Sequence, residues 1–243
     1  IIAVMKGAQI GFSSGVIEGG VGWIISQSPG NTLLLVGHED LVKKTSTKVD
    51  KLIDACGIRD LIRSNTLRKR NNKSGDTDTR KDFAGGHLAL GSANHKTIRQ
   101  ESYKYGFVDD FESMRTDSKE SGDTTELVEQ RFAAFATQMK LMYISTPELK
   151  ESSNIEPVYL KGDQRKYHIP CPCCGEFIRL EWEVDAELED IDKAGMYWEL
   201  DESGKLVTES VGYMCYKCGD VFDDSNKMEL LRYGEWWPTA EPT

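Results

Sequence analysis

The alternation of short apolar runs with segments of helical periodicity is the strongest constraint on the fold of this chain. Strands are expected at 1–5, 32–37, 87–91, 105–108 and 141–144, and helices at 15–26, 38–56 and 123–139. The strands are mostly aliphatic or aromatic throughout, which is typical of strands buried on both faces. The alternation therefore predicts an α/β fold with a parallel sheet flanked by helices. In such sheets, ligands bind beyond the carboxyl ends of the strands.

Charge divides the chain near residue 150. The whole chain has a net charge of −10. Residues 151–243 carry 9 Lys and Arg against 21 Asp and Glu, a net charge of −12. Residues 1–150 carry 21 Lys and Arg against 19 Asp and Glu, a net charge of +2. We predict two domains, 1–150 and 151–243, with any DNA contact in the first. The densest basic cluster there is a candidate for contact with the DNA backbone, and a solvated loop is the equal alternative: Arg68, Lys69, Arg70 and Lys73.

The turn after the first strand carries part of a phosphate-binding loop. The usual pattern is G-x-x-x-x-G-K-[ST], and the candidate residues are Lys6, Gly7, Ala8, Gln9, Ile10, Gly11, Phe12, Ser13 and Ser14. Gly11 and Ser13 occupy their usual places, whereas Phe12 stands at the usual lysine position and the lysine is Lys6. Backbone N–H groups of such a turn cradle phosphate oxygens, and Ser13 can bind Mg²⁺. Taken alone, this window is better explained as a strand–turn–helix with an incidental lysine.

An acidic pair follows the strand expected at 105–108. An apolar strand that ends in Asp109 and Asp110 can deliver one carboxylate to Mg²⁺ and a second to the attacking water. We assign Asp109 to the metal and Asp110 to the water, with Glu112 as the alternative for the water. A solvated helix N-terminus is an equally good explanation of this segment on its own.

Two Cys-x-x-Cys pairs, each followed by glycine, predict a structural Zn²⁺ site in the acidic half. The predicted ligands are Cys171, Cys174, Cys215 and Cys218, which leaves Cys56 and Cys173 as ordinary thiols. A disulfide framework is the alternative and requires an oxidising compartment. We expect a reducing, cytoplasmic setting, and the longest apolar runs are far too short to span a bilayer.

In combination, these motifs resemble the large terminase subunits of tailed bacteriophages, in the GpA-like branch. The resemblance covers nearly the whole chain and rests on the order and spacing of the segments at 5–13, 85–93, 107–110, 131–132, 144–147, 155–156, 167–176 and 234–239. It implies a P-loop NTPase domain followed by a small zinc-ribbon-like region. It also implies an ATP-driven motor that moves double-stranded DNA into a phage procapsid in the host cytoplasm.

The resemblance further implies cofactors, partners and residue roles. The cofactors are ATP, Mg²⁺ and Zn²⁺. The partners are double-stranded DNA, a small terminase subunit and the portal protein, on which the subunits form a homo-oligomeric ring. A displaced phosphate-loop lysine is a known variation in such motors and supports Lys6, while Ser145 and Thr146 resemble the motif that senses the γ-phosphate. Arg131 is either a charge-compensating residue or a surface arginine, and the surface position is slightly favoured.

Two departures from the family pattern are evident. The family usually has Asp-Glu where this chain has Asp109-Asp110, so the shorter second carboxylate puts full turnover in question. Family members also carry an adenine-contacting region before the phosphate loop and a metal-dependent nuclease domain after the zinc region, so this sequence is expected to be a fragment. The alternative functions are a helicase-like remodelling ATPase and a zinc-dependent nucleic-acid-binding scaffold with an inactive nucleotide site.

Overall fold

The computed structural model divides the chain into two compact units, Ile1–Gly162 and Asp163–Thr243. The structure describes residues 1–63, 75–92, 101–114, 117–118, 122–149, 152–225 and 227–242. The boundary expected near residue 150 precedes helix α5 (Ile155–Leu160), which packs against strands of the first unit and so extends that unit to Gly162. Among the described residues, no helix combines the length and the apolar character needed to cross a membrane.

A six-stranded sheet forms the centre of the first unit. Its strands lie in the order β1 (Ile2–Met5), β8 (Lys140–Ser145), β5 (Tyr105–Asp109), β2 (Thr32–Val36), β4 (Gly86–Ser92) and β3 (Arg80–Phe83). All neighbouring strands are parallel except β3, which pairs antiparallel with β4 at the edge. The five predicted strands are therefore confirmed, and the carboxyl ends of β1, β8 and β5 lie next to one another.

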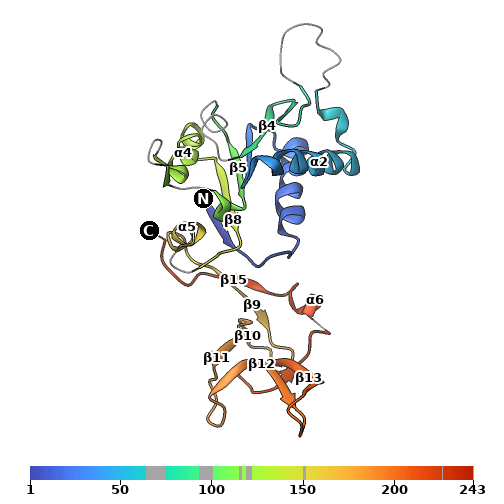
Figure 1. Ribbon diagram of the computed structural model, residues 1–243, viewed down its shortest axis with the longest axis vertical. Helices are drawn as coiled ribbons and strands as arrows, with labels where there is room; N and C mark the ends of the chain where they lie inside the picture. The colour runs from blue at the N-terminus through green and yellow to red at the C-terminus, as the bar shows by residue number, and fades with distance from the viewer. Residues whose placement is uncertain are drawn as a thin grey trace. The chain divides into compact units, whose positions relative to one another are not determined.

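Helices cover both faces of this sheet, as Figure 1 shows for α2 (Glu39–Ala55) and α4 (Thr124–Gln130). Strand β2 is buried over its whole length: Leu34 and Val36 join the core beneath α1 (Gly19–Gln27) and α2, while Leu33 and Leu35 join the core beneath α4 and α5. Burial on both sides explains why this strand has no alternation of apolar and polar residues.

Two elements depart from the sequence prediction. Strand β3 was not among the five predicted strands, because the polar segment 59–82 is compatible with a hairpin or with an ordered loop. Its polar side chains are satisfied by ion pairs: Lys81, only 1% exposed, lies 2.9 Å from Asp50 of α2 and 2.8 Å from Asp76. The helix expected at 123–139 is also shorter, since α4 ends at Gln130 and only a 3₁₀ turn, Ala133–Phe135, follows.

Glycine in the middle of β5 has a packing reason. A Cβ atom on Gly106 would lie 2.4 Å from the Phe132 ring and 2.7 Å from Leu141. Phe132, which follows α4, is fully buried against this strand. The absence of a side chain at Gly106 therefore lets the segment after α4 pack directly on the sheet.

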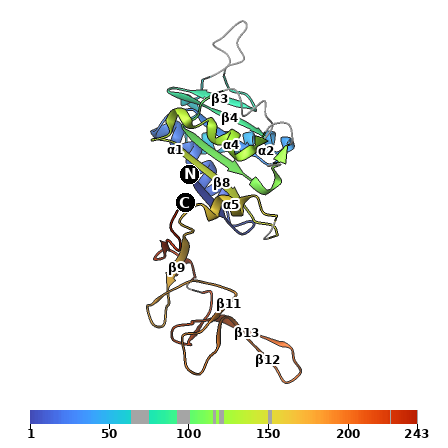
Figure 2. The ribbon, with the colours of Figure 1, turned by 90° about the vertical axis from the view of Figure 1, so that its left-hand side faces the viewer.

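The second unit is built from short antiparallel strands. One sheet has the order β10 (Phe177–Ile178), β9 (Lys166–Pro170), β15 (Glu235–Trp237), and the other has β11 (Glu183–Asp185), β12 (Lys193–Leu200), β13 (Leu206–Met214), β14 (Val221–Phe222). Strands β12 and β13 form the long hairpin visible in Figure 2. A short helix, α6 (Lys227–Leu230), precedes β15.

Candidate active site and metal centre

The turn between β1 and α1 is the candidate phosphate-binding loop. Gln9 and Gly11 both have positive φ angles, 56° and 76°, so the chain reverses tightly after Gly7. A π-helical segment, Ser13–Glu18, then leads directly into α1. Residues 7–11 are exposed, and successive N–H groups at such a turn and helix start form an anion site.

Phe12 stands at the position of the usual lysine because it has a packing role. Its ring is partly buried and packs against the apolar core that Ile17 and Val21 form beneath α1. Phe12 therefore anchors the loop to the core, and a cation for the candidate phosphate site would have to come from another position. Lys6 immediately follows β1, and its backbone N–H donates to the carbonyl of Ser145 at 3.0 Å.

Three of the predicted residues meet at the ends of β1 and β5. The Ser13 hydroxyl donates to the Asp109 carboxylate at 3.1 Å. Burial raises the pKa of Asp109, while the Ser13 hydrogen bond and the nearby charge of Lys6 oppose this rise. A hydroxyl and a partly buried carboxylate in contact are an oxygen ligand set suited to Mg²⁺, and a divalent cation would offset the burial of the carboxylate.

Asp110 is held in an unusual backbone conformation next to this pair. Its φ and ψ angles, 58° and 47°, are left-handed, a region that aspartate tolerates better than most residues. The Ser113 hydroxyl donates to its carboxylate at 2.6 Å. Asp110 thus lies one residue beyond the candidate metal ligand with a fixed carboxylate, as a residue that orients water requires.

The remaining predicted site residues differ in their placement. Ser145 is buried at the end of β8, beside β1 and β5, whereas Thr146 is exposed. Arg131 lies near the amino end of β5, because its carbonyl accepts from the N–H of Tyr103 just before that strand begins. An extended chain covers about 20 Å between Tyr103 and Asp109. The basic cluster Arg68, Lys69, Arg70 and Lys73 lies outside the described residues.

The four predicted zinc ligands converge in the second unit. The sulfur atoms of Cys171, Cys174, Cys215 and Cys218 all lie within 4.8 Å of one another. All six cysteines lie in described parts of the chain, and each is a free thiol. Tetrahedral ligation at about 2.3 Å places thiolate sulfurs a little under 4 Å apart, so a small contraction of this cluster would accommodate Zn²⁺.

The two cysteine turns repeat the same backbone pattern. The N–H groups of Gly175 and Gly219 each donate at 2.9 Å to the carbonyl of the cysteine four residues earlier, and both glycines have φ close to 79°. Burial alone would raise the pKa of Cys171, but N–H groups of Cys174 and Cys173 and two neighbouring thiols bring it below its usual value. Donors directed at sulfur favour thiolate, the form that binds metal, at Cys171. Burial raises the pKa of Cys215 and of Cys218.

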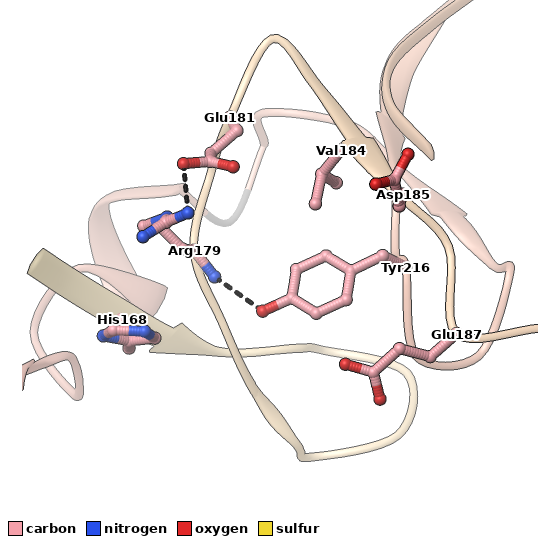
Figure 3. Close-up of a pocket in the computed structure, with 7 residues that line it drawn as sticks. All are labelled: His168, Arg179, Glu181, Val184, Asp185, Glu187 and Tyr216. Atoms are coloured by element: carbon pink, nitrogen blue, oxygen red, sulfur yellow. Dashed lines mark hydrogen bonds and ion pairs between the residues drawn. The ribbon is translucent and has the colours of Figure 1, made fainter. Parts of the chain in front are cut away.

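A separate pocket of about 240 Å³ lies in the second unit (Figure 3), lined by His168, Arg179, Glu181, Val184, Asp185, Glu187 and Tyr216. Its carboxylates are paired: Glu181 with Arg179, Asp185 with Lys193 at 2.6 Å, and Glu187 with Lys217 at 2.5 Å. The seven lining residues carry three carboxylates and one guanidinium, so the lining is acidic, and none of them belongs to the candidate phosphate-binding turn. Such a lining is a poor site for phosphates, and the carboxyl ends of β1 and β5 in the first unit remain the candidate nucleotide site.

Comparison with known proteins identifies the family. The family model described as "Phage terminase large subunit gpA, ATPase domain" matches residues 1–236. The chain belongs to this family. A curated relative, the terminase large subunit of Enterobacteria phage P21, is 28% identical over 92% of this chain, and the chain spans about a third (33%) of that protein's length.

Two solved structures are also similar to the chain. The large terminase of bacteriophage HK97 is 13% identical, with a TM-score of 0.49 over 66% of this chain and 33% of that chain. The large terminase ATPase domain of Thermus phage P74-26 is 14% identical, with a TM-score of 0.45 over 66% of this chain and 64% of that chain.

Gly37 is a site residue that sequence reasoning missed. It follows β2, and a Cβ atom there would lie 2.5 Å from the Asp110 carboxylate and 2.8 Å from Cβ of Ser113. The position therefore has to be glycine for Asp110 to occupy its present place. In the sequence, Gly37 only marks a plausible strand end, because Asp110, the residue it lies against, is 73 positions away.

Gly37→Ala is predicted to displace Asp110 and to impair ATP hydrolysis more than ATP binding. A shift of about 1 Å in a catalytic group costs up to roughly 100-fold in rate. Steady-state turnover and equilibrium binding of an ATP analogue would measure the two effects. Gly19→Ala is the matched control, since a Cβ there would meet no atom of the described residues within 4 Å. Normal turnover by Gly37→Ala would show that the position of Asp110 does not matter.

The cysteine cluster predicts about one Zn²⁺ per chain, bound by four thiolates. Cys174→Ser should lower the zinc content, and chelation should destabilise Asp163–Thr243 while leaving Ile1–Gly162 folded. Elemental analysis and thermal unfolding followed by hydrogen exchange would show both effects. Cys173→Ser is the control, because Cys173 is exposed and outside the cluster. Metal-free protein of equal stability would contradict the prediction.

Proposed function

We propose that this chain is the ATP-hydrolysing part of a motor that drives double-stranded DNA into a phage procapsid. The observation that supports this most directly is the contact between Ser13 and Asp109, beside the turn that begins at Lys6. Membership of the terminase ATPase-domain family supports ATP hydrolysis. Transport of DNA is the proposed use of that hydrolysis.

The positions of the candidate residues support the following roles. Backbone N–H groups of residues 7–14 hold the phosphates, and Lys6 neutralises the outer ones. Ser13 and Asp109 hold Mg²⁺, which supplies charge neutralisation for the phosphoryl group when bound. Asp110 orients the attacking water. Ser145 and Thr146, at the end of the strand between β1 and β5, sense the γ-phosphate.

Substitution of the three charged residues tests these roles. Lys6→Ala should lower ATP turnover by about 10²–10³-fold with the fold intact. Asp109→Asn should abolish Mg²⁺-dependent turnover, whereas Asp110→Asn should stop hydrolysis and preserve nucleotide binding. Asp110→Glu, the usual family residue, should keep or raise activity. The measurements are ATP turnover and binding of an ATP analogue with Mg²⁺.

The outcomes separate the proposal from its alternatives. Parent-like turnover in Lys6→Ala would show that Lys6 does not act on the phosphates. Equal loss of nucleotide binding in Asp109→Asn and Asp110→Asn would overturn the division of roles between the two aspartates. A scaffold with an inactive nucleotide site would hydrolyse no ATP with or without double-stranded DNA. A helicase-like ATPase would separate strands, which a packaging motor does not need to do.

We further propose that the basic cluster Arg68, Lys69, Arg70 and Lys73 contacts the DNA backbone without reading sequence. Replacing all four with glutamine should flatten the plot of log affinity against log salt, because each lost phosphate contact reduces the slope by about 0.9. Double-stranded DNA binding between low and physiological salt would measure this. Lys43, Lys44, Lys48 and Lys51 of α2, replaced together, provide a charge-matched control. An unchanged slope in the first variant would leave the cluster as solvated surface.

The other proposed features come from the family. The motor acts in the host cytoplasm as a homo-oligomeric ring on the portal protein, with a small terminase subunit as a further partner. Zn²⁺ is structural in this proposal, because four thiolates leave no open ligand position for chemistry. The nuclease activity expected of the family is assigned to no residue of this chain.

A further inference from the structure

We propose that Glu112 is a positioning residue that links the nucleotide site to helix α5, so that the γ-phosphate end of the site and the start of α5 move together. This inference rests on the proposed ATPase function. It starts from a continuous series of hydrogen bonds that joins Lys6, Ser145, Glu112 and Asn154.

Ser145 forms the nucleotide-side half of this series. Its carbonyl accepts from the N–H of Lys6 at 3.0 Å, and its hydroxyl oxygen accepts from the N–H of Glu112 at 3.0 Å. Ser145 is only 1% exposed, so water does not compete for these contacts. One buried residue thus holds both the start of the phosphate loop and the turn that follows Asp109 and Asp110.

The Glu112 carboxylate forms the other half. It accepts from the backbone N–H groups of Asn154 at 2.7 Å and Ile155 at 3.3 Å, and from the hydroxyl of Ser153. The Asn154 side-chain amide donates back to the carbonyls of Glu112 at 3.2 Å and Met114 at 2.9 Å. A carboxylate that accepts from the first N–H groups of a helix caps it and complements its positive end.

These contacts give Glu112 a different task from Asp110. Three donors occupy the two oxygens of Glu112, whereas Asp110 accepts from Ser113 and lies beside Asp109. We therefore prefer Asp110 as the residue that orients water. Glu112 was the alternative for that role on sequence grounds, and its contacts with Ser153, Asn154 and Ile155 come from the tertiary fold.

The connection between the two carboxylates is short and stiff. Only Phe111 separates Asp110 from Glu112, within the 3₁₀ turn Phe111–Ser113. Phe111 and Ile155 are both fully buried in the same apolar core, so the turn and the start of α5 are packed as well as hydrogen-bonded. Closely packed interiors transmit small displacements rather than absorb them. Helix α5 is also the last helix before the second unit begins at Asp163.

Hydrogen exchange at the amides of Asn154 and Ile155 reports on this link directly. We expect their exchange rates to differ between the ADP-bound and ATP-analogue-bound full chain. In Glu112→Gln both amides should exchange at least about tenfold faster, since hydrogen bonds to a charged acceptor are lost. In this variant, the exchange rates of the two amides should no longer differ between the ADP-bound and ATP-analogue-bound states. Binding of the ATP analogue should change by less than about threefold, while turnover falls about tenfold or more.

Matched variants distinguish linkage from a local structural effect. Ser153→Ala should show a weaker version of the same changes, and the double variant should be no worse than Glu112→Gln alone, because both act on one contact. Glu156→Gln, in the first turn of α5, is the control and should behave as the parent. If Glu112→Gln fails to fold, Ser153→Ala and Asn154→Ala carry the test.

The outcomes also separate this inference from the proposed function. Nucleotide-dependent exchange that persists in Glu112→Gln, or fully additive effects of Glu112→Gln and Ser153→Ala, would overturn the linkage. The linkage would also be overturned if, in the parent protein, the amides of Asn154 and Ile155 exchanged at the same rate with ADP as with the ATP analogue. A parent protein that binds no nucleotide would instead overturn the proposed ATPase function, and the linkage with it.

Discussion

Burial of both faces of the parallel sheet determines where polar chemistry can occur in the first unit. Alternate residues of β2 enter the two apolar cores, so neither face has room for charged groups at this central strand, and the buried Lys81 lies on the edge strand β3. Polar side chains that serve a ligand are therefore confined to the ends of the strands. The order β1-β8-β5 brings the candidate phosphate-binding turn, Ser145 and Asp109 together at one such end. The contact between Ser13 and Asp109 and the hydrogen bonds of Ser145 depend on that order.

The same edge shows how closely packing and chemistry are connected. Burial raises the pKa of Asp109, and Ser13 and Lys6 only partly compensate, which leaves a carboxylate suited to a bound cation. Asp110 adopts a left-handed conformation, and Gly37 supplies the space that its carboxylate occupies. Backbone strain of this kind is maintained where surrounding contacts over-determine it. Here the Ser113 hydroxyl holds the Asp110 carboxylate, and the hydrogen bonds of Glu112 to the start of α5 hold the turn that follows.

The second unit is stabilised by different means. Its apolar core comprises Ile169, Cys171, Ile178, Tyr213 and Cys215, and two of these five residues are proposed metal ligands. Large apolar side chains such as Trp182 and Trp198 remain 73% and 46% exposed. A core this small supplies little free energy of folding, so a metal held by four thiolates is an effective substitute.

The sequence by itself determined the parallel strands of the first unit and the cysteine pairs of the second. Apolar runs predicted the five parallel strands, because strands buried on both faces cannot accommodate polar residues, and the two Cys-x-x-Cys pairs predicted a cluster that the structure brings within 4.8 Å. The tertiary structure alone decided the rest. It brought together residues that lie 20 or more positions apart in the sequence: Gly37 and Asp110, Glu112 and Asn154, and Arg131 and Tyr103 near the amino end of β5. Periodicity and spacing describe only local neighbours, whereas these contacts are fixed by strand order and by how the cores pack.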